Sequence, residues 1–176
     1  RKAIANEQEE RVLSERRVAL ARSFDARPCP EGTIDDLALG QFDAYRREVV
    51  DQETIAANHR PIELQLASLR LFDPERACPT HAGILLFGKN PRFFLPGSYV
   101  QYLKLPATDL TDLPEDQAEI SGDLHSVLRE LEGRLKLLIR TSMQPVSALE
   151  EKLLPDYPEW ALRELLMNAV MHRNYD

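Results

Sequence analysis

The sequence lacks several features that would assign it to a large functional class. It has no apolar run of the roughly 20 residues that a membrane-spanning helix needs, and no signal peptide is evident. Its two cysteines, Cys29 and Cys78, match neither a metal-binding spacing nor a disulfide framework, so a reducing cytosol is the expected compartment. No Gly-x-x-x-x-Gly-Lys-Ser/Thr motif occurs, which excludes a helicase motor of the P-loop type from this chain.

Basic residues are also in the minority. The chain has 22 Lys and Arg against 29 Asp and Glu, a formal net charge of −7. A main nucleic-acid surface should be basic, so this segment is not expected to provide one. With 43% hydrophobic and 29% charged residues, the composition is typical of a soluble globular protein. A length of 176 residues allows one or two domains with a sizeable core.

Residues 1–32 are interpreted as a charged helix followed by a linker. The helix is predicted over residues 4–22, where arginines and glutamates interleave. Interleaved charge is typical of a solvated face, although the arginines could also form a strip that faces phosphate. Residues 23–34 contain two prolines and a glycine, which indicate an extended linker or a turn.

Residues 33–96 are predicted to form a small helical module, either winged-helix-like or of another kind. Thr33 is expected to cap a helix that runs to about Glu48, and Pro61 is expected to open a second helix after a polar segment. After a turn-rich break, Thr80 is expected to cap a short third helix that stops at Gly88. The expected core residues of the first helix are Leu37, Leu39, Phe42, Tyr45 and Val49.

Residues 97–176 alternate between strand and helix patterns. We predict a strand over 98–105, an acidic loop over 106–119, a long helix over about 120–142 and a weak strand near 146–154. The carboxylates of the acidic loop could hold a cation, but such clusters are more often solvated. The whole sequence is therefore predicted to adopt an α+β fold.

The closing helix, which we expect to begin around Pro158, carries the most distinctive pattern. Its expected apolar face consists of Leu162, Leu165, Leu166, Ala169 and Val170. Beside this face run Trp160, Glu164, Asn168 and His172, each four residues after the last. Four-residue steps place side chains on one side of a helix, so a carboxylate, a carboxamide and an imidazole are expected to lie in line.

This combination of side chains suits nucleotide chemistry. Asn168 can offer an oxygen to Mg²⁺, which binds few protein ligands together with water and phosphate. Glu164 could accept a proton from an attacking water, and His172 and Arg173 could meet phosphate. Spacing alone leaves a second interpretation open, an ordinary surface helix whose polar side carries Glu, Asn and His.

Two segments resemble a known family. The segment from Glu164 to Arg173 (ELLMNAVMHR) resembles the N-box of the Bergerat-fold (GHKL) ATPases, which include gyrase, the Hsp90 chaperones, MutL and the sensor histidine kinases. The longer segment from Tyr157 to Tyr175 resembles the version in bacterial and archaeal transcriptional regulators that are often described as RecG-related ATP-dependent DNA helicases. Residues 79–96 (PTHAGILLFGKNPRFFLP) resemble the signature that these regulators carry between a Schlafen/AlbA-like DNA-binding domain and a GHKL ATPase domain.

The resemblance implies a role for each matching position. Glu164 would be the general base of an ATPase, Asn168 the Mg²⁺ ligand, and His172 and Arg173 would contribute to nucleotide binding. Residues 97–176 would then be the first part of a GHKL-like α/β sandwich. The later glycine-rich parts of a Bergerat site do not appear, and the chain begins with Arg, so we expect an internal fragment whose DNA-binding domain is absent.

The expected function is that of an ATP-responsive transcriptional regulator in the cytoplasm of a bacterium or archaeon. Its expected partners are ATP and Mg²⁺ in the full-length protein, DNA through the absent domain, and further copies of itself, with no membrane. The alternative is a regulator or oligomerisation scaffold that does not hydrolyse ATP and keeps the N-box helix for structural reasons.

Overall fold

The computed structural model describes residues 23–106, 113–145 and 151–175. Helices and small antiparallel sheets make up an α+β fold, which confirms the predicted class. The chain divides into two compact units, Arg1–Ile84 and Leu85–Asp176. The division falls at residues 84 and 85, whereas the sequence suggested a change of architecture near Pro96. The predicted helix over residues 4–22 lies outside the described residues.

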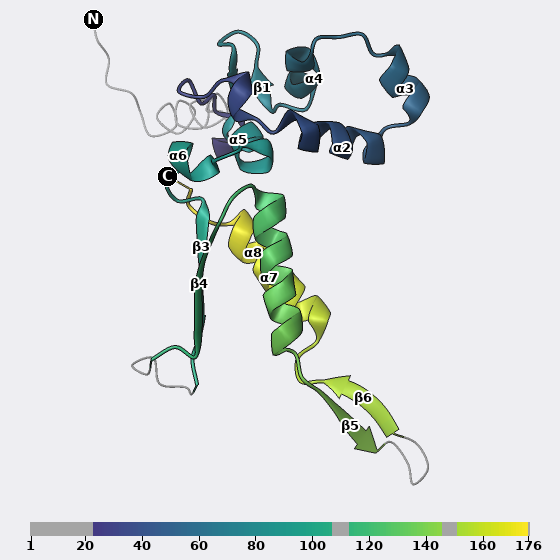
Figure 1. The fold of residues 1–176 in the computed structure, drawn as a ribbon, viewed down its shortest axis with the longest axis vertical. Helices are drawn as coiled ribbons and strands as arrows, with labels where there is room; N and C mark the ends of the chain where they lie inside the picture. The colour runs from purple at the N-terminus through teal and green to yellow at the C-terminus, as the bar shows by residue number, and fades with distance from the viewer. Residues whose placement is uncertain (1–22, 107–112, 146–150, 176) are drawn as a thin grey trace, which may run out of the picture. The chain divides into compact units, whose positions relative to one another are not determined.

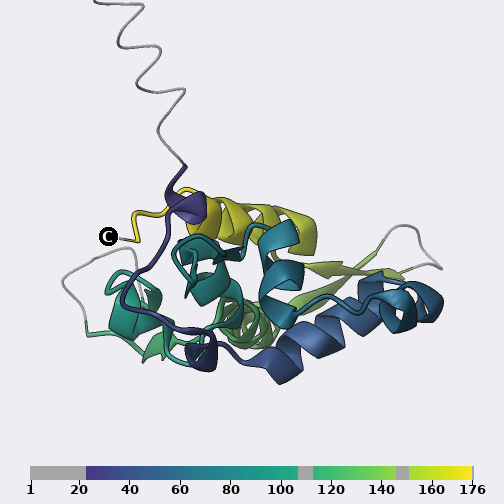
Figure 2. The same cartoon turned by 90° about the horizontal axis from the view of Figure 1, so that it is seen from above.

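From residue 23 onward, the N-terminal unit is mostly helical and contains one very short hairpin (Figure 1; Figure 2). Its elements, labelled as in Figure 1, are η1 (Phe24–Ala26), η2 (Ile34–Asp36), α2 (Leu39–Val49), α3 (Gln52–Ala57), α4 (Ile62–Ser68), β1 (Phe72–Asp73) and β2 (Cys78–Pro79). Helix α5 (His81–Phe87) continues across the division into the second unit.

One helix boundary and one additional helix in this unit differ from the prediction, and one helix cap agrees with it. The backbone N–H and the hydroxyl of Thr33 both donate to the Oδ2 atom of Asp36 at 2.8 Å, which closes a single 3₁₀ turn. Helix α2 therefore starts only at Leu39. The polar segment after it contains the unpredicted helix α3, because Asp51 accepts from the N–H of Thr54 and caps it. Thr80 caps α5 as predicted, by accepting from the N–H of Gly83.

The core of the N-terminal unit uses only part of the expected apolar set. Leu37 and Phe42 are buried, as predicted, whereas Tyr45 and Val49 are exposed, and Leu66 of α4 is buried as well. Both cysteines are also buried, and burial raises the pKa of each thiol. A raised pKa keeps the thiols protonated at neutral pH and therefore unreactive.

The described residues of the second unit form two hairpins and three further helices. They are α6 (Pro91–Phe94), β3 (Tyr99–Lys104), β4 (Asp116–Ser121), α7 (Leu124–Leu138), β5 (Thr141–Pro145), β6 (Glu151–Pro155) and α8 (Glu159–Met171). Strand β4 corrects the predicted loop over 106–119. Asp123 then caps α7 by accepting from the N–H of Ser126, so this helix begins later than predicted. The β5–β6 hairpin replaces the single weak strand, and part of the acidic loop, 107–112, lies outside the described residues.

The core of the second unit lies between the β3–β4 hairpin and the two long helices. Val100 pairs with Ile120 in the antiparallel register. Ile120 forms a buried cluster with Val127 and Leu131 of α7, and Leu166 of α8 packs against this cluster. Figure 1 shows the hairpin running alongside α7 and α8. In the described part of the chain, no helix combines the length and the apolar character that crossing a membrane requires.

Two glycines of the N-terminal unit offer a matched test of how closely its backbone segments pack. A Cβ on Gly83 would lie 2.1 Å from the carbonyl oxygen of Leu71, whereas a Cβ on Gly40 of α2 would have no heavy atom within 4 Å. We expect Gly83→Ala to lower the free energy of unfolding by about 3 kcal/mol, because backbone must move. Gly40→Ala should instead raise it by up to about 1 kcal/mol, because alanine favours helix. Urea denaturation followed by circular dichroism measures both, and equal effects would contradict the packing described.

Candidate functional site

Helix α8 carries two of the four predicted site residues, Glu164 and Asn168, while His172 caps its end and Arg173 follows. The inner face of the helix fixes its position. Val170 is buried, and Leu166 packs on the core cluster of the second unit. Pro158 lies immediately before the first helical residue, close to the predicted start, and Glu159 occupies the positive end of the helix dipole. Leu165 and Ala169, which the apolar pattern assigned to the buried face, are exposed instead.

The chain after α8 turns back and fastens the end of the helix. The hydroxyl of Tyr175 donates to the carbonyl oxygen of Val170 at 2.8 Å, and the Tyr175 side chain is buried. A Cβ on Gly97 would lie 2.9 Å from the carbonyl carbon and oxygen of Tyr175, so only glycine allows this close approach. Burial raises the pKa of the Tyr175 hydroxyl, while the nearby charge of Arg173 acts in the opposite direction.

The four predicted site residues fall into two groups. Glu164 and Asn168 lie one turn apart on the exposed outer side of α8, and His172 follows them as the exposed C-terminal cap. Arg173 is separated from this line. Its guanidinium lies over the rings of Tyr99 and Tyr175, at 5.2 and 5.7 Å from their centroids, where cation–π attraction helps to hold it.

The outer side of α8 is chemically available. Within the described residues, the side chains of Glu164 and Asn168 form no hydrogen bond or ion pair. No group of three or more His, Cys, Asp or Glu residues in the described part of the chain could hold a metal ion. One carboxamide oxygen fits Mg²⁺ only where water and phosphate complete the coordination, which is the usual arrangement for this ion.

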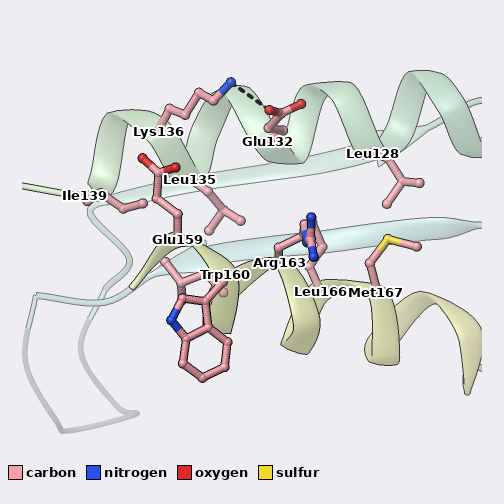
Figure 3. Close-up of a pocket in the computed structure, with 11 residues that line it drawn as sticks. Leu128, Glu132, Leu135, Lys136, Ile139, Glu159, Trp160, Arg163, Leu166 and Met167 are labelled. Carbon is pink, nitrogen blue, oxygen red and sulfur yellow. Dashed lines mark ion pairs between the residues drawn. The ribbon is translucent and has the colours of Figure 1, made fainter. Parts of the chain in front are cut away.

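A groove between α7 and α8 was not predicted from the sequence. It has a volume of about 510 Å³, and its apolar lining includes Leu128, Leu135 and Leu166 (Figure 3). Charged side chains from both helices stand at its edge: Glu132, Lys136, Glu159 and Arg163. The sequence signal for these charges is an acidic residue four positions before a basic one, which occurs twice on α7 and once on α8. Tyr175 and Gly97 were also missed as positioning residues, because their contact joins distant parts of the chain.

Comparisons with known proteins establish the fold and nothing further. No protein-family model matches the sequence, and no curated protein matches it either. The crystal structure of the DIP2311 protein from Corynebacterium diphtheriae is similar, with a TM-score of 0.59 and 20% sequence identity. The similarity covers 92% of this chain and 30% of that one, so this chain spans less than a third of the length of the protein it resembles.

The Tyr175 contact makes a measurable contribution to stability. Tyr175→Phe should lower the free energy of unfolding by about 1 kcal/mol, since the carbonyl of Val170 loses its side-chain donor. The pKa of Tyr175 is higher in the folded than in the unfolded chain, so the unfolded state loses this proton first as pH rises. Stability should therefore fall as pH rises above about 10, and Tyr175→Phe should reduce that fall.

Tyr157→Phe is the matched control, because Tyr157 is exposed and makes no hydrogen bond within the described residues. Thermal melts of the two variants at neutral pH and at about pH 10.5 would make the comparison. Identical behaviour of both variants would contradict the role given to the Tyr175 hydroxyl.

Proposed function

We propose that this chain belongs to an ATP-responsive transcriptional regulator, in which it links a DNA-binding domain to a GHKL-type ATP-binding domain. The observation that carries the proposal is the outer side of α8. Glu164 and Asn168 stand there one turn apart, exposed and without a hydrogen-bonding partner among the described residues. These are the residue types, in the order, of the N-box that the sequence resembles.

The proposed roles follow from the chemistry of each side chain. The Asn168 carboxamide oxygen would hold Mg²⁺, which supplies positive charge to offset that of the phosphates. The Glu164 carboxylate would accept a proton from the water that attacks the terminal phosphate. His172 would contact phosphate from the end of the helix. Arg173 is the second proposed phosphate contact, and it would have to leave the rings of Tyr99 and Tyr175 to reach phosphate.

The proposed partners follow from charge and from the family resemblance. The net charge of −7 is consistent with DNA binding through a domain outside this chain. From the resemblance, we also propose a protein of the bacterial or archaeal cytoplasm that forms homo-oligomers. No membrane partner is proposed.

A second candidate is a regulator or scaffold that keeps the N-box helix for structural reasons alone. The observation in its favour is the engagement of Arg173 and Tyr175 in fastening α8. In this case the last residues of the resembling segment stabilise the fold, and nucleotide chemistry is not needed to explain them.

Calorimetric titration of ATP with Mg²⁺ into the longest natural protein that contains this sequence separates the two candidates. We expect binding that Asn168→Ala weakens at least tenfold, because the ion loses its protein oxygen. Glu164→Gln should leave binding nearly unchanged and abolish ATP turnover, because the amide cannot accept the proton.

The control for Asn168→Ala is Gln101→Ala, which removes another exposed carboxamide, from β3. It should change neither binding nor turnover. Equal ATP binding by the wild type and Asn168→Ala would overturn the assignment of the ion. Absence of ATP binding in the intact protein would support the structural candidate instead.

A further inference from the structure

The groove between α7 and α8 exposes apolar surface on two adjacent helices. Leu128 and Leu135 line it from α7, and Leu166 and Met167 line it from α8. Figure 3 shows side chains from both helices lining the groove. A groove between two helices suits a protein side chain or helix better than a small molecule, which is usually surrounded on most sides.

Trp160 stands at the edge of this groove and is 71% exposed. Figure 3 shows its indole projecting from the first turn of α8, away from α7. Tryptophan is the residue type most enriched among the anchors of protein interfaces, where it fills a pocket on the partner. The same patch therefore presents both a projecting anchor and a cavity that could receive one.

The charges at the edge of the groove are balanced. Glu132 precedes Lys136 by four residues on α7, and these two form an ion pair with a Nζ–Oε1 distance of 2.7 Å. Glu159 precedes Arg163 by four residues on α8, but neither forms an ion pair within the described residues. In a chain with a net charge of −7, this neutral patch is a place where two copies can approach without repulsion.

We propose that the α7–α8 groove is a self-association surface, on which a second copy of this chain docks about a two-fold axis. In such a contact, the same patch is used by both copies, and each pairwise contact occurs twice. Trp160 of each copy enters the groove of the other, and Glu159 faces Arg163 of the partner subunit. The patch could pair with itself in this way. It contains an anchor, Trp160, together with a cavity, and an acid, Glu159, together with a base, Arg163.

Other occupants fit this patch less well. Nucleic acid and anionic membranes would need an excess of basic side chains, which the edge of the groove lacks. The contact also leaves Glu164 and Asn168 outside the groove, since neither lines it. This proposal rests on the homo-oligomer of the proposed function and names its surface. Its test uses no nucleotide, so its failure can be distinguished from failure of the nucleotide site.

Charge reversal tests the two-fold contact directly. Glu159→Arg should place arginine against arginine in both halves of the dimer, and Arg163→Glu should place glutamate against glutamate. We expect each variant alone to dimerise at least tenfold more weakly than the wild type in sedimentation equilibrium. An equimolar mixture of the two variants should recover dimers, because opposite charges then meet at both contacts. Trp160→Ala should also weaken dimerisation at least tenfold.

Glu48→Arg is the matched control, since it makes the same charge change at an exposed position of α2 and should leave the association constant unchanged. Circular dichroism melts would establish that each variant is folded before its association is compared. A wild-type chain that stays monomeric at millimolar concentration would overturn the proposal. So would dimers that the reversals do not weaken, or a mixture that recovers no dimer.

Discussion

The apolar contact between one face of the β3–β4 hairpin and helix α7 is the interaction on which the second unit depends. A two-stranded sheet is at best marginally stable in water without a helix or further strands against its apolar face. Ile120 of β4 meets Val127 and Leu131 of α7, and Val100 and Tyr102 of β3 flank them. Because successive strand residues point to opposite faces, a shift by one position would turn this whole apolar set toward solvent.

Helix α8 joins this core through a narrow strip, and that determines which of its side chains are left exposed. Leu166 and Val170 point inward, and Tyr175 fastens the last turn from outside the helix. With one side fixed in this way, the opposite side must face away from the core, and Glu164 and Asn168 lie there. Side chains on a helix held at its inner face and at its C-terminal end have well-defined positions, which a catalytic or ion-binding group requires.

The sequence predicted those features that depend on neighbouring residues. The strand at Tyr99–Lys104, the capping role of Thr80 and the period of α7 all follow from local patterns. Strand β4 was missed because its sequence, Asp116-Gln-Ala-Glu-Ile-Ser121, is polar, and only pairing with β3 makes it a strand. The stripe at Trp160, Glu164 and Asn168 was read correctly as one side of a helix. The exposure of Leu165 was not predicted, because periodicity cannot show how wide a strip of the helix the core covers.

Helix α8 has apolar side chains on sides that do not face the core. Its 13 residues include Trp160, Leu165 and Met171, each more than half exposed, besides those that reach the core. An isolated surface helix is normally polar on the side away from the core, and a helix that is apolar on several sides is normally covered on more than one of them. The inner strip accounts for one covered side. The groove shared with α7 lies beside Trp160, and self-association there would cover a second side of the helix and remove Trp160 from water, whereas Leu165 and Met171 lie outside the groove.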